Sequence, residues 1–130
     1  MVDVELIGTG EAGVAPAELE RLCTVALARV GIAEGHLAIE FVDEHRIREL
    51  NRLHRGLDEP TDVLSFGVDE SGPSAGPREL GDIVICPVHT ADVREAVIHG
   101  ALHLAGMDHE TDAGEMLALQ DELLQASGRR

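Results

Sequence analysis

Apolar positions recur along this chain with two different spacings. Alternation with polar residues predicts strands, and recurrence every three to four residues predicts helices. Val2, Val4 and Leu6 alternate with acidic residues, so the chain is expected to begin with a half-buried strand. Pro16 suits the first turn of a helix, and Gly31 is expected to close it. The apolar residues expected on the core side of this helix are Leu19, Leu22, Val25, Ala26 and Val30.

Three more strands and one helix are predicted in the middle of the chain. The strand candidates are residues 37–42, 62–66 and 81–86, and the last is nearly all apolar, which suits the centre of a sheet. Asp43 is expected to cap a helix. The apolar stripe of that helix would contain Ile47, Leu50 and Leu53.

The last third of the chain is expected to be helical. Asp92, followed by Glu95, is typical of the capped start of a helix, which would run toward Gly106. A final helix would cover residues 113–126, whereas residues 67–77 lack periodicity and predict a loop. The inward side of the final helix would hold Met116, Leu119, Leu123 and Leu124. The element order β-α-β-α-β-β-α-α predicts an α+β fold in one domain over residues 1–130, with a small mixed sheet of about four strands packed with helices.

Charge and composition limit the ways in which this chain can bind nucleic acid. Its formal net charge is −15, which argues against a general nucleic-acid coat, because phosphate neutralisation is the main source of non-specific affinity. Phe41 and Phe66 are the only aromatic residues, which leaves almost no platform for stacking bases. No signal peptide or membrane span is visible, so we expect a cytoplasmic protein in which Cys23 and Cys86 are buried, inert thiols.

Three histidines near the C-terminus predict a metal site. His99 and His103 are four residues apart and would share one face of a helix. Gly106 can end that helix in a left-handed conformation and so turn His109 back as a third ligand. Three imidazoles leave a fourth position for water, as in catalytic zinc sites. We therefore expect one Zn²⁺ per chain, on a late helix and the following turn, with a charge of about +2 that favours an anionic substrate such as a phosphodiester.

The histidine spacing also matches the extended zinc-peptidase motif H-E-x-x-H-x-x-G-x-x-H. Gly100 stands where those peptidases have their general base. Glycine cannot take a proton, so a metallopeptidase is a weaker alternative.

A second group of candidate residues is a cluster of arginines. Arg46, Arg48, Arg52 and Arg55 fall within ten positions, and we expect Arg48 and Arg52 to belong to a solvated helix face. Arg55 is the candidate functional residue, because guanidinium groups fork onto phosphate oxygens. Three other histidines, His36, His45 and His89, are expected to be solvated or locally hydrogen-bonded.

Three blocks of sequence together resemble the YbeY family of bacterial metal-dependent ribonucleases and ribosomal RNA maturation factors. They are NRLHRGLDEPTDVLSF at residues 51–66, LGDIVIC at 80–86 and HGALHLAGMDH at 99–109. The resemblance implies a single-strand-specific endoribonuclease that acts in maturation of the 16S rRNA 3′ end and in ribosome quality control. It also implies zinc on His99, His103 and His109 and a functionally important Arg55. A non-catalytic, zinc-containing assembly factor that binds ribosomal RNA or small-subunit ribosomal proteins stays open, since an acidic surface suits basic partners.

Overall fold

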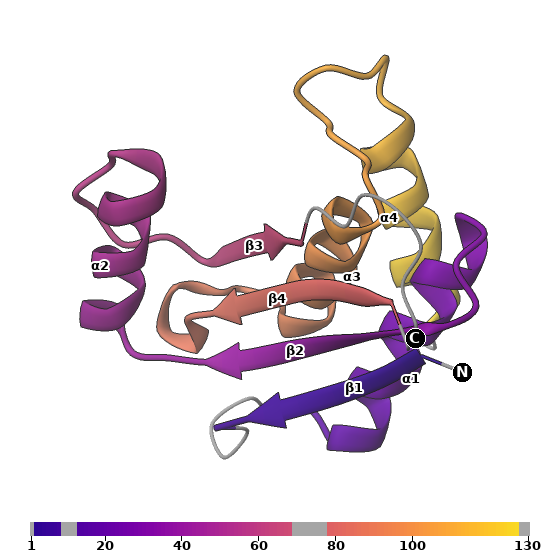
Figure 1. Cartoon of the computed structure of the whole chain (residues 1–130), viewed down its shortest axis with the longest axis horizontal. Coiled ribbons are helices and arrows are strands. Elements are labelled where there is room, and N and C mark those ends of the chain that lie inside the picture. The colour runs from indigo at the N-terminus through magenta and orange to yellow at the C-terminus, as the bar shows by residue number, and fades with distance from the viewer. Residues whose placement is uncertain (1, 9–12, 69–77, 128–130) are drawn as a thin grey trace.

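Within the residues that the structure describes (2–8, 13–68 and 78–127 of this computed structural model), four strands form one mixed sheet (Figure 1). The strands are β1 (Val2–Ile7), β2 (Gly35–Phe41), β3 (Val63–Gly67) and β4 (Glu79–Ile85), in the spatial order β1-β2-β4-β3. β2 is parallel to both β1 and β4, whereas β3 is antiparallel to β4. The predicted α+β fold with a mixed sheet is confirmed, and the nearly all-apolar strand β4 lies inside the sheet.

Four helices accompany the sheet in the part of the chain that the structure describes, and two of them begin at a capping aspartate. The four are α1 (Pro16–Arg29), α2 (Glu44–Arg55), α3 (Val93–Leu104) and α4 (Glu115–Ala126), and a 3₁₀ helix (Pro87–His89) follows β4. The Asp43 carboxylate accepts the Arg46 N–H at 2.8 Å at the start of α2, and Asp92 accepts the Arg94 N–H at 3.0 Å at the start of α3. None of the helices in the described segments is long and apolar enough to cross a membrane.

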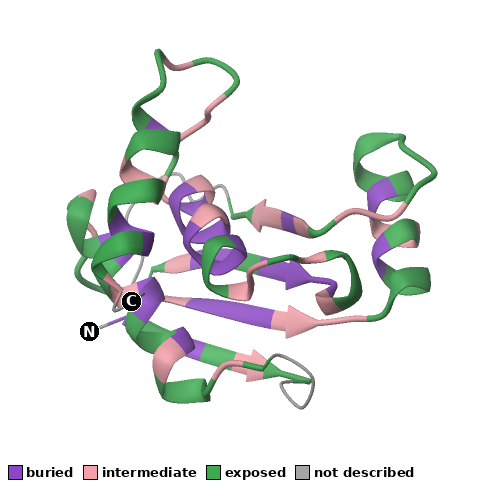
Figure 2. Ribbon diagram, turned by 180° about the vertical axis from the view of Figure 1, so that it is seen from behind, coloured by how far each residue is buried: buried purple, intermediate pink, exposed green. Residues whose placement is uncertain are grey.

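The two faces of the sheet bury separate apolar clusters. Helices α1, α3 and α4 pack on one face, against side chains such as Val4, Ile39 and Ile83. On the other face, Ile47 of α2 packs with Leu64 of β3 and with neighbours on and after β4. Figure 2 shows that α3 and the inner strands carry much of the buried surface. The larger cluster therefore packs α3 against β4, and the smaller one packs α2 against the start of β3.

Several details of the sequence prediction are wrong. Val25 and Leu53 are 40% and 59% exposed, although both were expected to face the core. Strand β4 starts at Glu79, two residues earlier than predicted, and Gly67 belongs to β3 instead of the following loop. The rest of the predicted loop lies largely outside the described residues, since 69–77 are not described.

Both cysteines are buried as expected, and burial raises the pKa of Cys23 to about 12, which suits an unreactive thiol.

Candidate metal centre

The three predicted histidines lie together at the end of α3. Their ligand nitrogens are all within 4.8 Å of one another, and the His99 and His103 rings have centroids 4.7 Å apart. Gly106 has a φ of 99°, and the backbone N–H of Met107 bonds to the carbonyl of Leu102 at 3.0 Å. This turn brings the His109 ring to 5.2 Å from that of His99. The expected geometric role of the glycine is thus observed.

Hydrogen bonds orient two of the three rings. Nδ1 of His99 donates to Oε1 of Gln120 at 2.7 Å, and Nδ1 of His103 donates to the carbonyl of Met107 at 3.0 Å. Each bond leaves Nε2 unprotonated in the neutral ring, which is the arrangement that metal-binding histidines usually have. Burial lowers the pKa of His103, which favours its neutral, ligating form. The donor set therefore fits a divalent metal such as zinc.

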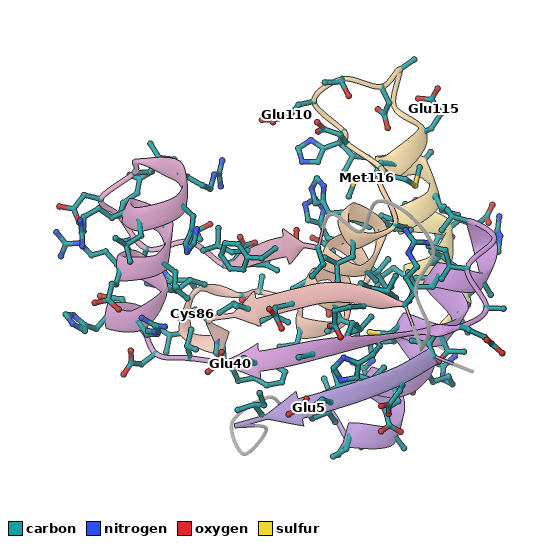
Figure 3. The ribbon with its side chains drawn as sticks, viewed as in Figure 1. Glu5, Glu40, Cys86, Glu110, Glu115 and Met116 are labelled. Carbon is teal, nitrogen blue, oxygen red and sulfur yellow. The ribbon has the colours of Figure 1, made fainter. Side chains whose placement is uncertain are left out.

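The histidines face an open hollow of about 490 Å³. Its lining also includes Val63, Leu64 and Ser65 from β3 and the segment from Gly106 to Glu110. In Figure 1 α2 and the segment before α4 rise on either side of β3, and Figure 3 shows Glu110 on that segment. Arg55 lines the hollow from the α2 side. The hollow thus brings together all four residues that the sequence singled out as candidate site residues.

Arg55 is held at the end of a helix whose C-terminus is closely defined. Gly56 follows it with a φ of 73°, and its N–H bonds to the carbonyl of Arg52 at 3.1 Å. The buried side chain of Asn51 donates to the carbonyl of Glu59 at 2.9 Å and so ties the next loop to α2. Within the described segments Arg55 has no ion-pair partner, so its guanidinium is available to an anion.

The neighbouring arginines have different surroundings. Arg46 pairs with Glu49, and Arg48 pairs with Asp58 at 2.9 Å. Arg52 is exposed and lines neither this hollow nor the adjoining one described below. The expectation that Arg48 and Arg52 belong to a solvated helix face is therefore confirmed.

Three of the four remaining histidines, His36, His45 and His89, do not line this hollow. His36 bonds to Glu79 at 2.9 Å and His89 to Glu44 at 2.6 Å, whereas His45 is exposed. These positions agree with the expectation of solvated or locally hydrogen-bonded side chains.

Sequence reasoning missed Gln120 and Glu95. Gln120 lies on α4, 21 residues from His99, and no sequence spacing indicates that contact. Glu95 is different, because it lies four residues before His99 on α3 and shares its helix face. The helical spacing that linked the first two histidines could have identified it.

Asp108 uses its carboxylate to accept the Glu110 N–H at 2.9 Å and so stabilises the turn.

Gly100 lies on the side of α3 that packs against β4, and not on the side that carries the histidines. A Cβ at this position would lie 2.7 Å from Cγ2 of Ile83, inside the packed interface between α3 and β4. Gly100 is itself buried. A glutamate here would clash with the sheet instead of reaching the hollow, so the structure adds a steric argument against the peptidase alternative.

The fold and the site define a class of small α+β proteins with a candidate three-histidine metal site on a largely buried helix and the turn that follows it. Comparison with known proteins narrows this class. The family model for Endoribonuclease YbeY matches residues 14–128. A protein of that name from Moorella thermoacetica is 41% identical, with 86% of each chain covered, and one from Rubrobacter xylanophilus is 40% identical, with 91% of this chain and 89% of the relative covered. This chain belongs to the Endoribonuclease YbeY family.

A solved structure supports the same fold. The solution structure of TM1509 from Thermotoga maritima has a TM-score of 0.61 and 28% sequence identity. The match covers 95% of this chain and 88% of that one. The likeness therefore spans the sheet, the helices and the histidine segment together.

Proposed function

We propose that this chain is a single-domain, zinc-dependent endoribonuclease that cleaves single-stranded RNA. Its membership of a family of endoribonucleases supports a hydrolase that acts on phosphodiester bonds. The observation that carries the proposal is that Arg55, a fixed positive charge without a partner in the described segments, lines the same hollow as His99, His103 and His109. A metal cation and a guanidinium that line the same hollow suit a phosphodiester better than a peptide, because a phosphodiester is negatively charged and a peptide bond is not.

The residues of this chain would divide the work at one phosphate. His99, His103 and His109 would hold the metal, which when bound supplies Lewis acidity toward a phosphate oxygen. Arg55 would bind a non-bridging oxygen of the same phosphate and stabilise the charge that develops there. The exposed carboxylate of Glu110, which lines the hollow, is available to accept a proton.

The physiological substrate in this proposal is ribosomal RNA in a cytoplasmic location. Cleavage would mature the 3′ end of 16S rRNA and serve ribosome quality control. Such substrates supply single strands, and a hollow open to solvent admits a single strand more readily than a rigid duplex. The proposal includes small-subunit ribosomal proteins as partners, because a net charge of −15 attracts basic surfaces.

The acidic charge also supports a second candidate, a non-catalytic assembly factor in which zinc stabilises the fold. The two candidates differ in turnover. The test is cleavage of a labelled single-stranded RNA by purified protein in excess substrate, compared with His103→Ala. The nuclease proposal expects multiple turnovers that the substitution abolishes. Binding of ribosomal components without turnover would favour the assembly factor, and undiminished cleavage by both His103→Ala and Arg55→Ala would contradict the assigned site.

A further inference from the structure

A second hollow of about 450 Å³ adjoins the first. The two share Arg55, Val63 and His99 in their linings, so they meet beside the histidine group. The second one extends toward the N-terminal half of α3, where Asp92 and Glu95 line it. An RNA strand that crosses the candidate metal centre would therefore have space on both sides of the three histidines.

Charge decides which part of a nucleotide each region can hold. Arg55 is the only arginine among the described residues that line either hollow, and the chain has no lysine. The second hollow carries three carboxylates, on Asp62, Asp92 and Glu95. A phosphate would be repelled there and would be attracted to the junction at Arg55. The second hollow is thus suited to the uncharged part of a nucleotide, its base and ribose.

Most polar groups in the second hollow can only accept hydrogen bonds. The hydroxyls of Thr61 and Thr90 use their protons within the protein, on Asp62 Oδ1 and on the carbonyl of Cys86. Their lone pairs and the carboxylates remain as acceptors. The wall therefore favours a ligand whose edge presents donors.

Glu95 and Gln120 are the best placed groups to read a base. Glu95 lies one helical turn before His99, is exposed, and its carboxylate has no partner among the described residues. The Oε1 atom of Gln120 accepts from His99 at 2.7 Å, which leaves its amide N–H groups as donors on this wall. An acceptor and a donor thus flank the same histidine.

We propose that the second hollow is a nucleobase subsite that prefers a base with an exocyclic amino group over uracil. The inference rests on the proposed function. Glu95 accepts from the amino group of cytosine, adenine or guanine, and Gln120 donates to a neighbouring ring nitrogen or oxygen. Uracil has one N–H on its pairing edge, between two carbonyl oxygens that repel a carboxylate. Glu95 is thereby the residue that determines specificity.

The first test maps cleavage in a uridine-only RNA strand with one internal cytidine, adenosine or guanosine. The wild-type protein is expected to cut beside the inserted base about tenfold faster than between uridines, in line with the discrimination that one good base contact gives. Glu95→Gln should remove most of that preference, because an amide can donate to uracil. Glu34→Gln is the matched control, since this exposed glutamate lines neither hollow. Equal cutting by the wild type, or a preference that survives in Glu95→Gln, would overturn the inference.

A second measurement does not depend on catalysis. Cytidine monophosphate should shift the NMR signals of the Gln120 side-chain amide more than uridine monophosphate does, and Glu95→Gln should make the two nucleotides equivalent. This difference in a protein that cleaves no RNA would support the subsite while contradicting the nuclease. Cleavage without base preference, together with equal shifts from both nucleotides, would overturn the subsite and leave the nuclease standing.

Discussion

Oε1 of Gln120, on α4, accepts a hydrogen bond from Nδ1 of His99, on α3, at 2.7 Å. The two residues are 21 positions apart, and the packing of α4 against α3 brings them together. The bond fixes the ring orientation of His99 and leaves Nε2 as the atom that can ligate a metal. The last helix of the chain therefore supports the candidate metal centre as well as the core.

Gln120→Leu is expected to weaken zinc binding about 10- to 100-fold, because it removes the acceptor that orients His99. Gln120→Glu should keep most of the affinity, since a carboxylate accepts the same bond. Competition with a coloured chelator measures the affinity directly. Gln125→Leu is the control on the same helix, where the exposed glutamine contacts Asp121 and not the histidines. An unchanged affinity in Gln120→Leu would show that the contact does not position His99.

Arg55→Ala should lower kcat for RNA cleavage about 100-fold, the effect expected when a donor to the developing charge is lost. Arg55→Lys should recover only part of the rate, since an ammonium group cannot fork onto a phosphate. Because Arg55 is exposed, the free energy of unfolding should stay within about 0.5 kcal/mol of the wild type. Arg52→Ala should leave cleavage near the wild-type rate, and an equal loss in both variants would contradict a specific role for Arg55.

Gly100→Ala should lower the free energy of unfolding by about 1–3 kcal/mol, as overpacking usually does. The added Cβ would lie 2.7 Å from Cγ2 of Ile83, which is fully buried. Urea denaturation measures the change. Gly67→Ala is the control, because a Cβ added there would meet no heavy atom within 4 Å beyond its chain neighbours. Equal stabilities of wild type and Gly100→Ala would mean that α3 can shift away from β4.

The contact between His36 and Glu79 predicts a pH-dependent contribution to stability. The hydrogen bond to Glu79 raises the pKa of His36, and the charges of Asp3 and Glu5 add to that effect. The contribution is fully present below the unfolded pKa of about 6.5 and is lost as pH rises through the folded pKa. Its size should be below about 1 kcal/mol, because the pair is partly solvated.

Urea denaturation should be measured at pH values from below about 6.5 to above the folded pKa of His36. As pH rises through this range, the wild type should lose stability relative to His36→Gln. His45→Gln, on the exposed side of α2, should keep the wild-type slope. Parallel curves for the wild type and His36→Gln would contradict the coupling.

Local sequence signals predicted the elements well, because each depends on a few adjacent residues. Asp43 and Asp92 cap helices by bonds to N–H groups two or three residues on, so sequence alone could place both helix starts. Packing between elements was less predictable. Leu53 has the spacing of a core residue, but α2 meets the sheet only through the side that carries Ile47 and Leu50.

The candidate site likewise contains some features that local sequence predicts and others that depend on packing between distant segments. His99 and His103 share a helix face, and the turn at Gly106 is local, so their meeting with His109 could be predicted. The Gln120 contact depends on how α4 returns over α3, which no local spacing encodes. The second hollow likewise forms between segments distant in sequence, and only the structure reveals that it adjoins the histidines.

The most direct test of the central claim is the rate of single-stranded RNA cleavage by metal-free protein before and after zinc is added back. Chelator-treated protein should be folded but at least about 100-fold slower, and about one equivalent of Zn²⁺ per chain should restore the rate. The same addition should not restore His103→Ala. Full cleavage by protein shown by metal analysis to contain no metal would contradict a catalytic metal at His99, His103 and His109.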